Sequence, residues 1–240
     1  MRVAIVGATG RLGSLAARLV QDAPDLELHA AVGSADSLDA VNGADVIFDA
    51  TRLEVSRRVV EHAVNALIPV VVGTSGWTAQ RIAELGTVHS PVCVIPNFSL
   101  GSVLGSAIAA LAAPFFDTVD VVETHHAGKL DSPSGTAVRT AELIADARRR
   151  VGLEGAVPGA GQDARGQLVA GVPVHSLRQA GVVAEQVVTL GRLGESLRIE
   201  HVTTSSESYA EGILLALRSA PDLRGIVVGL DALLDLPGLS

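Results

Sequence analysis

The sequence predicts an α/β protein that combines a doubly wound parallel sheet with an inserted α+β domain. Short apolar, β-branched runs alternate with helical segments through residues 1–100, with Gly or Pro at the junctions. A glycine-rich loop at 7–13 follows the first of these runs and begins a helical segment. The chain has 240 residues, 48% hydrophobic and 2% aromatic, so two compact domains with cores of Ala, Val and Leu are expected.

The parallel sheet is expected to use short strands joined by helices. The apolar run at 2–6 predicts the first strand, and the helical spacing of Leu12, Leu15 and Leu19 predicts a helix over 11–21. The other elements expected in this half are strands at 26–32, 45–50, 69–73 and 91–96 and helices at 54–66 and 81–85.

The pattern changes near residues 96–101. An Ala-rich helix at 102–113 is expected there, followed by a strand at 118–127, a turn and a second helix at 137–149. The Gly-, Ala- and Pro-rich stretch 152–171 predicts a long surface loop. Strand-like runs at 172–181, 182–191 and 196–204 predict a mixed sheet. In the tail we expect a helix at 207–219 and a short helix at 231–235, with the apolar run 225–230 between them.

These patterns predict two domains. Residues 1–100 with 208–240 form the first, which carries the parallel sheet, and residues 101–207 form the inserted domain.

Charge and composition exclude several classes of protein. The net charge is −8 and the isoelectric point is near 5.3, which argues against a nucleic-acid or anionic-membrane partner. The single cysteine, Cys93, excludes an intrachain disulfide and lies in a predicted strand as a core residue. No signal peptide or membrane-spanning run is apparent, so a cytoplasmic protein with a small-molecule ligand is expected.

The glycine loop predicts a dinucleotide site. Gly7, Gly10 and Gly13 lie between a strand and a helix, where glycines permit close backbone approach and the helix N-terminus attracts a pyrophosphate. Arg11 is placed to reach a phosphate. The alternatives are a glycine turn that only packs and an arginine that only faces solvent. This loop makes the predicted sheet domain Rossmann-type.

The end of the second strand bears on the choice of cofactor. An Asp or Glu usually stands there to bind the ribose hydroxyls of NAD, but this chain has Val32, Gly33 and Ser34, with Asp36 two residues further on. The missing acid removes a repulsion against the 2′-phosphate. NADPH or NADH is therefore expected as cofactor, with NADPH favoured.

Lysine usage marks a second candidate site. Of 18 basic residues, only Lys129 is a lysine, and lysine can exchange a proton where arginine cannot. A GC-rich genome, in which most positions that need a positive charge become arginine, is the alternative explanation of this ratio. Lys129 lies beside His125 and His126, and the turn 134–136 precedes a predicted helix, which indicates a catalytic or anion-binding site. Surface histidines and a simple helix cap are the alternative; adjacent histidines without a third ligand predict no metal.

Motifs along most of the chain resemble one enzyme family. They are GATGRLG at 7–13, DAT at 49–51, GTSGW at 73–77, PNFSLG at 96–101, ETHHAGKLDSPSGTA at 123–137, GVPVHSLRQAG at 171–181 and GESLRIEH at 194–201. Together they are similar to the signatures of the dihydrodipicolinate (4-hydroxy-tetrahydrodipicolinate) reductases of lysine and diaminopimelate biosynthesis.

The resemblance implies an NAD(P)H-dependent reductase of a cyclic imine dicarboxylate, 4-hydroxy-tetrahydrodipicolinate. It implies that His125 is the catalytic histidine and Lys129 the proton-donating lysine, with Arg178 a candidate helper. The inserted domain would bind substrate and form a homotetramer. The implied substrate-binding residues are His126, Ser134, Gly135 and Thr136. The implied cofactor contacts are Gly7, Ala8, Thr9, Gly10, Arg11, Leu12, Gly73, Thr74, Ser75, Pro96, Asn97 and Phe98.

The chain also departs from the family pattern. Ala127 and Gly128 replace larger, often basic residues, and Glu207 stands where arginine is common. The other departures are Ala50, Ser75 and Trp77. They leave open a diverged paralogue that reduces another cyclic imine or enamine in secondary metabolism. A non-catalytic dinucleotide-binding regulator is the alternative from another class; the retained lysine argues against it.

Overall fold

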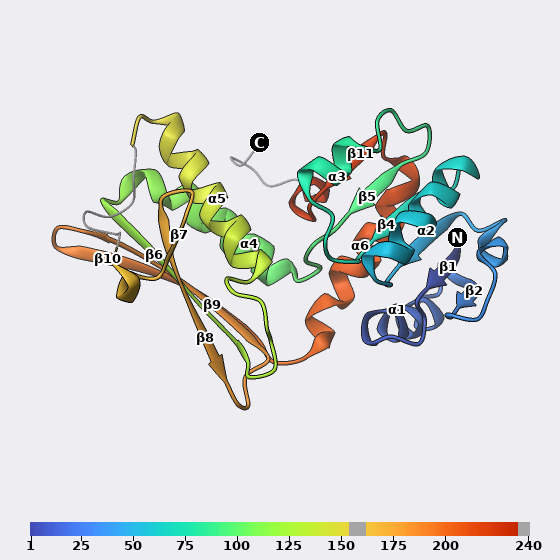
Figure 1. The fold of residues 1–240 in the computed structure, drawn as a ribbon, viewed down its shortest axis with the longest axis horizontal. Helices are drawn as coiled ribbons and strands as arrows, with labels where there is room; N and C mark the ends of the chain where they lie inside the picture. The colour runs from blue at the N-terminus through green and yellow to red at the C-terminus, as the bar shows by residue number, and fades with distance from the viewer. Residues whose placement is uncertain (154–161, 235–240) are drawn as a thin grey trace. The chain divides into compact units, whose positions relative to one another are not determined.

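The computed structural model describes residues 1–153 and 162–234 and confirms the predicted α/β class (Figure 1). One compact unit contains Met1–Leu100 together with the described chain from Tyr209 onward, and the other lies within Gly101–Ser208. The first carries a parallel sheet and the second a mixed sheet, as the sequence predicts for a Rossmann-type domain with an insertion.

The sheet of the first unit is parallel throughout its described strands. In spatial order these are β11 (Ile226–Val228), β5 (Val92–Val94), β4 (Val70–Val72), β3 (Val46–Asp49), β1 (Arg2–Val6) and β2 (Glu27–Val32). The chain leaves β1 toward β2 on one side and later returns to β3 on the other. This reversal of strand order is where open parallel sheets bind their ligands, outside the carboxyl ends of the strands.

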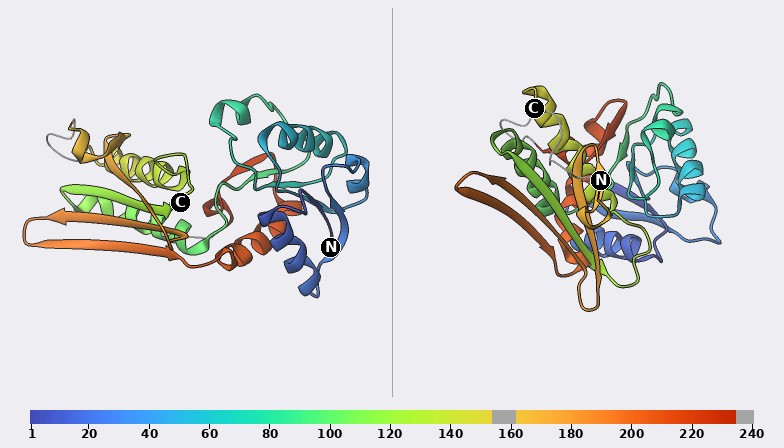
Figure 2. Two further views of the ribbon diagram at one scale, coloured as in Figure 1. Left: turned by 60° about the horizontal axis from the view of Figure 1, so that its bottom comes forward. Right: turned by 60° about the vertical axis from the view of Figure 1, so that its left-hand side comes forward.

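Helices cover this sheet (Figures 1 and 2). They are α1 (Arg11–Asp22), α2 (Leu53–Asn65), α3 (Ala79–Ala83) and α6 (Ala210–Ser219). Val6 and Val72 of the strands share an apolar cluster with Val59 and Ala63 of α2, while α1 packs against β1 and α6. Every residue of β3, β4 and β5 is buried, which agrees with their apolar sequences, in which Asp49 at the end of β3 is the one polar residue. Burial raises the pKa of the Cys93 thiol in β5 to about 12, as befits a core residue.

The sheet of the second unit is mixed. Across the described chain its strands lie in the order β10 (Glu195–Thr203), β9 (Ala184–Arg192), β6 (Thr118–His126), β8 (Val172–Gln179) and β7 (Gln167–Val169). Strands β6 and β8 are parallel, and the other neighbours are antiparallel. Alanines of α4 (Leu100–Ala112) and α5 (Gly135–Arg150) pack on inward valines such as Val121 and Val174.

Two sequence-based expectations need correction. The predicted loop 152–171 contains strand β7, which pairs with β8 through a tight turn at Ala170 and Gly171, both with positive φ. A strand of three residues in a Gly-rich segment shows no periodicity, so the pattern missed it. Residues 154–161 of that stretch lie outside the described chain. The tail helix begins at Ala210 after a 3₁₀ turn, and only a 3₁₀ turn at Asp231–Leu233 occupies the described part of the last predicted helix.

Candidate active site

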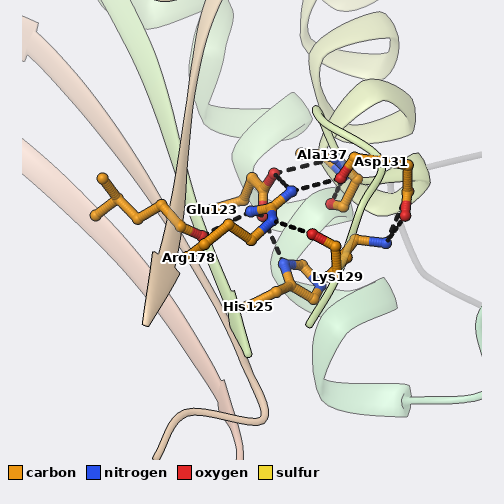
Figure 3. Close-up of polar contacts among 8 residues, drawn as sticks. Glu123, His125, Lys129, Asp131, Ala137 and Arg178 are labelled. Carbon is orange, nitrogen blue, oxygen red and sulfur yellow. Dashed lines mark hydrogen bonds and ion pairs between the residues drawn. The ribbon is translucent and has the colours of Figure 1, made fainter. Parts of the chain in front are cut away.

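A buried carboxylate organises the histidine–lysine segment (Figure 3). Glu123 and His125 are two residues apart on β6, so their side chains leave the same face of the strand. His125 Nδ1 lies 2.5 Å from Glu123 Oε2, and the Glu123 side chain is fully buried. The following residue, His126, is exposed and leaves the opposite face. The two adjacent histidines therefore have different surroundings.

Arg178 completes this group from the neighbouring strand β8, where it lies in register with His125. Its Nη1 donates to Glu123 Oε2 at 3.0 Å and its Nη2 to Glu123 Oε1 at 3.1 Å. This two-pronged arrangement suits a planar guanidinium and a carboxylate and is stronger than a single contact. Arg178 thus holds the carboxylate that holds the histidine.

The same guanidinium also fixes the loop that carries the lysine. Arg178 Nε donates to the Lys129 carbonyl at 3.2 Å, and Nη2 donates to the Asp131 carbonyl at 2.6 Å. The Lys129 ammonium contacts both oxygens of Asp131, at 2.8 and 2.7 Å, and only 20% of the Lys129 side chain is exposed. This ion pair keeps the pKa of Asp131 below its usual range.

The surroundings of Glu123 and His125 determine which of the two side chains is charged. Burial works to raise the pKa of Glu123, but hydrogen bonds from Arg178, Ser176 and His125 outweigh it and lower the pKa. Burial lowers the pKa of His125, and the neighbouring positive charges of Lys129 and Arg178 act in the same direction against the raising effect of Glu123. At neutral pH the carboxylate is therefore ionised and the imidazole neutral.

The turn at 134–136 caps helix α5. Ser134 Oγ accepts from the Ala137 N–H at 3.2 Å, and the Ser134 N–H donates to Glu123 Oε1 at 3.1 Å. Gly135 is exposed and has open space where a Cβ would stand. Ser134 thus joins the helix start to the buried carboxylate. That Ser134, Gly135, Thr136 and His126 bind a substrate carboxylate stays a prediction.

The glycine loop has the shape that a dinucleotide site needs. Gly7 has φ +84°, and a Cβ there would lie 2.5 Å from the Ala50 carbonyl oxygen. A Cβ on Gly13 would lie 2.1 Å from the Gly7 carbonyl oxygen, so only glycine lets α1 start this close to the loop. These glycines leave backbone N–H groups at the start of α1, which fits a pyrophosphate.

The three predicted cofactor segments meet at the carboxyl ends of their strands. A Cβ on Gly73, after β4, would lie 2.8 Å from Leu12 Cδ2 and 2.9 Å from Phe98 Cε2. The segments 7–12, 73–75 and 96–98, far apart in sequence, are thus in contact within the first unit. Asn97 holds its own segment by accepting from the Ser99 N–H at 2.9 Å. The role of each residue toward the cofactor stays a prediction.

A buried network joins two of the motifs. Asp49 is fully buried at the end of β3 and accepts hydrogen bonds from the hydroxyls of Thr51 and Ser56. The Thr51 N–H donates to Thr74 Oγ1 at 2.9 Å, and Trp77 Nε1 donates to Ser56 Oγ at 2.8 Å. Trp77, a departure from the family pattern, therefore has a partner for its indole N–H.

The sequence analysis noted Asp36 but did not place its carboxylate at the end of β2. The chain turns after Gly33, so that Asp36 Oδ2 accepts from the Gly33 N–H at 2.7 Å. The Val32 carbonyl in turn accepts from the Gly7 N–H at 2.8 Å. An acid thus reaches the end of β2 from three residues further on, which the sequence alone does not reveal.

The sequence analysis gave Glu123 and Asp131 no role in the site. The two-residue spacing of Glu123 and His125 on a predicted strand is the signal that identifies Glu123, whereas nothing in the pattern marks Asp131. Among the residues that the structure describes, no three His, Cys, Asp or Glu side chains are placed to share a metal ion. None of the helices in that part of the chain is long and apolar enough to cross a membrane.

Comparison with known proteins identifies the family. Residues 1–98 and 101–234 match the family models described as dihydrodipicolinate reductase, N-terminus and C-terminus. A 4-hydroxy-tetrahydrodipicolinate reductase of Clavibacter michiganensis is 52% identical over 98% of this chain and 87% of that protein. One of Streptomyces coelicolor is 43% identical over 98% of each chain.

A solved structure agrees with these relatives. The dipicolinate-bound dihydrodipicolinate reductase from Paenisporosarcina sp. TG-14 is 28% identical, covers 98% of this chain and 99% of that one, and has a TM-score of 0.81. The predicted resemblance is confirmed: the chain belongs to the dihydrodipicolinate reductase family.

Proposed function

We propose that this chain catalyses the NAD(P)H-dependent reduction of 4-hydroxy-tetrahydrodipicolinate to tetrahydrodipicolinate, with Lys129 and His125 handling the proton. Its family makes it an oxidoreductase of lysine and diaminopimelate biosynthesis. The observation that carries the proposal is the position of the only lysine. Lys129 is held by the same guanidinium that clamps Glu123 against His125.

Each unit of the chain has its own task in this reaction. The loop 7–12 and segments 73–75 and 96–98 of the first unit would hold the cofactor, which when bound supplies a hydride. In the second unit Lys129 donates the proton, while the start of α5 and His126 hold the substrate carboxylates. The net reaction takes up a hydride and a proton and releases the 4-hydroxyl as water.

Consumption of NAD(P)H by the pure protein tests the proposal. The substrate is supplied as the product of the preceding synthase, and nicotinamide absorbance should fall only when it is added. Turnover of a monocarboxylate imine in its place would favour the diverged paralogue, which the relatives named above do not support. Cofactor binding without any turnover would favour the regulator.

Cofactor choice gives a first prediction. NADPH should serve at least as well as NADH, because Gly33 stands where the usual acid would, the Asp36 carboxylate is engaged by the Gly33 N–H, and Arg11 lies in the loop. Gly33→Asp should move the ratio of kcat/KM values toward NADH by about tenfold, since a carboxylate there repels the 2′-phosphate. Asp36→Asn is the matched control for the acid already present.

The ratio of kcat/KM values distinguishes three outcomes. No change in Asp36→Asn assigns the choice to position 33. A swing toward NADPH in that variant makes Asp36 the discriminating acid. A native preference for NADH above about tenfold contradicts the prediction.

The substrate pocket gives a second prediction. Pyridine-2,6-dicarboxylate should inhibit competitively with the imine substrate, because its two carboxylates need two donor sets. The exposed start of α5 at Gly135 offers one set, and the basic side chains His126 and Lys129 offer the other. Pyridine-2-carboxylate, which has a single carboxylate, is the matched control and should inhibit about tenfold less. Equal inhibition by both compounds, or none at millimolar concentration, contradicts the prediction.

Assembly and location complete the proposal. The family implies a homotetramer built through the inserted sheet, whose strands expose Leu177, Leu197 and Val202. A biosynthetic reductase of this kind is expected to work in the cytoplasm without a nucleic-acid or membrane partner.

A further inference from the structure

We infer that Glu123 is a positioning residue that, clamped by Arg178, fixes the His125 ring with its proton on Nδ1 and leaves Nε2 as an acceptor. The catalytic role of His125 belongs to the proposed function, on which the use of this tautomer rests. The tautomer itself follows from the hydrogen bonds around Glu123 and is measurable without substrate.

Both oxygens of Glu123 are fully committed. Oε1 accepts from Arg178 Nη2 and from the Ser134 N–H, each at 3.1 Å. Oε2 accepts from Arg178 Nη1 at 3.0 Å and contacts His125 Nδ1 at 2.5 Å. These donors come from β8, from the start of α5 and from β6 itself. A buried carboxylate needs such partners, and this one cannot rotate without losing two of them.

This arrangement leaves one assignment for the histidine proton. An ionised carboxylate only accepts hydrogen bonds, so the Nδ1 that contacts Glu123 must carry a hydrogen. A neutral imidazole has one N–H, and with that hydrogen on Nδ1 the other nitrogen keeps its lone pair. His125 is then an acceptor at Nε2, and the donation of a proton falls to Lys129. Glu123 thereby makes His125 a proton acceptor and leaves Lys129 as the proton donor.

A purely structural role for Glu123 is the competing explanation. Arg178 also bonds the carbonyls of Lys129 and Asp131, so the cluster cross-links β6, β8 and the loop whatever the histidine does. The test must therefore report on the ring of His125, and not only on stability or turnover.

Side-chain nitrogen NMR of the full-length protein, labelled with ¹⁵N at its seven histidines, reads the tautomer directly. His125→Asn assigns the signal. The native ring should show a protonated Nδ1 and an unprotonated Nε2. In Glu123→Gln the amide oxygen should take the Oε1 position, because Arg178 Nη2 and the Ser134 N–H there can only donate. The amide NH₂ then takes the Oε2 position beside His125 Nδ1, which can accept as a neutral ring. The proton should then move to Nε2.

Kinetics supply the second readout. Glu123→Gln should lower kcat by about 100-fold or more with KM changed less than about threefold, as expected when a base is held in the wrong tautomer. The charged groups facing His125 are Glu123 on β6, Arg178 on β8 and Lys129 on the loop. Glu123 is the one that raises the histidine pKa, so the acid limb of the kcat/KM profile should move to lower pH in the variant.

Matched variants make the outcomes decisive. Asp120 lies on the same strand and contacts His175 at 3.2 Å, so Asp120→Asn should leave kcat and the signal of His125 unchanged. Glu123→Asp keeps the charge and should recover part of kcat. A native ring protonated on Nε2, or a Glu123→Gln variant that keeps the Nδ1 proton, overturns the inference. If Glu123→Gln does not fold, the native tautomer and Glu123→Asp decide.

The two proposals fail in different ways. Absence of NAD(P)H oxidation by the native protein overturns the proposed function and leaves the tautomer measurement standing. Normal turnover with the Nε2 proton overturns only the role of Glu123.

Discussion

Lys129→Arg is expected to lower kcat by about 100-fold or more while the affinity for NADPH stays at its native value. Arginine keeps the positive charge and can still pair with Asp131, which Lys129 contacts at 2.7 Å. It cannot give up a proton in the working pH range, and its planar group does not place a donor where the ammonium stands. Steady-state kinetics measure the loss, and fluorescence titration with NADPH measures the retained binding.

Two further variants, Leu130→Arg and Lys129→Ala, show whether the loss of kcat in Lys129→Arg comes from the missing proton donor. Leu130→Arg adds a guanidinium to the same loop at a position that is 97% exposed, and should retain native turnover. Lys129→Ala removes both charge and proton and should be at least as impaired as Lys129→Arg. Near-native kcat in Lys129→Arg alone would make Lys129 an electrostatic anchor for a carboxylate and remove its role as acid.

Gly13→Ala is expected to destabilise the chain by about 3 kcal/mol and to weaken NADPH binding at least tenfold. A Cβ at Gly13 would lie 2.1 Å from the Gly7 carbonyl oxygen and 2.9 Å from Ala8 Cα. Both atoms are backbone, so relief requires the loop to move away from helix α1. The moved loop would no longer hold its N–H groups where a pyrophosphate needs them.

Gly10→Ala is the matched variant within the motif. Its Cβ would lie 3.4 Å from the same Gly7 oxygen, and the backbone there has φ −79°, which any residue adopts. The expected cost is under about 1 kcal/mol. Chemical denaturation of the two variants gives the free energies of unfolding. Equal losses in both, or a native affinity for NADPH in Gly13→Ala, would show that close packing at Gly13 is not required.

The central strands of the parallel sheet were predictable from sequence because they are buried on both faces. The runs at β3, β4 and β5 are apolar at nearly every position, and a helix follows each strand through a short junction. Strand β7 escaped prediction because its three residues gain their structure from pairing with β8, which local pattern does not encode.

The site was predictable only where its groups are close in sequence. His125 and Lys129 lie in one segment, so spacing alone brought them together. The partnership of Glu123 with Arg178 joins residues 55 positions apart and depends on β6 lying parallel to β8, a pairing that requires the whole topology. Asp36 reaches Gly33 through a turn whose course the composition does not determine. The contact residues of cofactor and substrate stay predictions until a bound ligand is observed.

The single lysine of this chain also makes the candidate site chemically addressable. Amine-directed acylating reagents or pyridoxal phosphate with borohydride have one ε-amino group to modify, that of Lys129, besides the α-amino group. Mass spectrometry of the intact protein measures the extent of labelling, which therefore reports on this one side chain without any mutation. A dicarboxylate that occupies the site would shield the ammonium, so protection from labelling becomes a binding assay that needs neither turnover nor a chromophore.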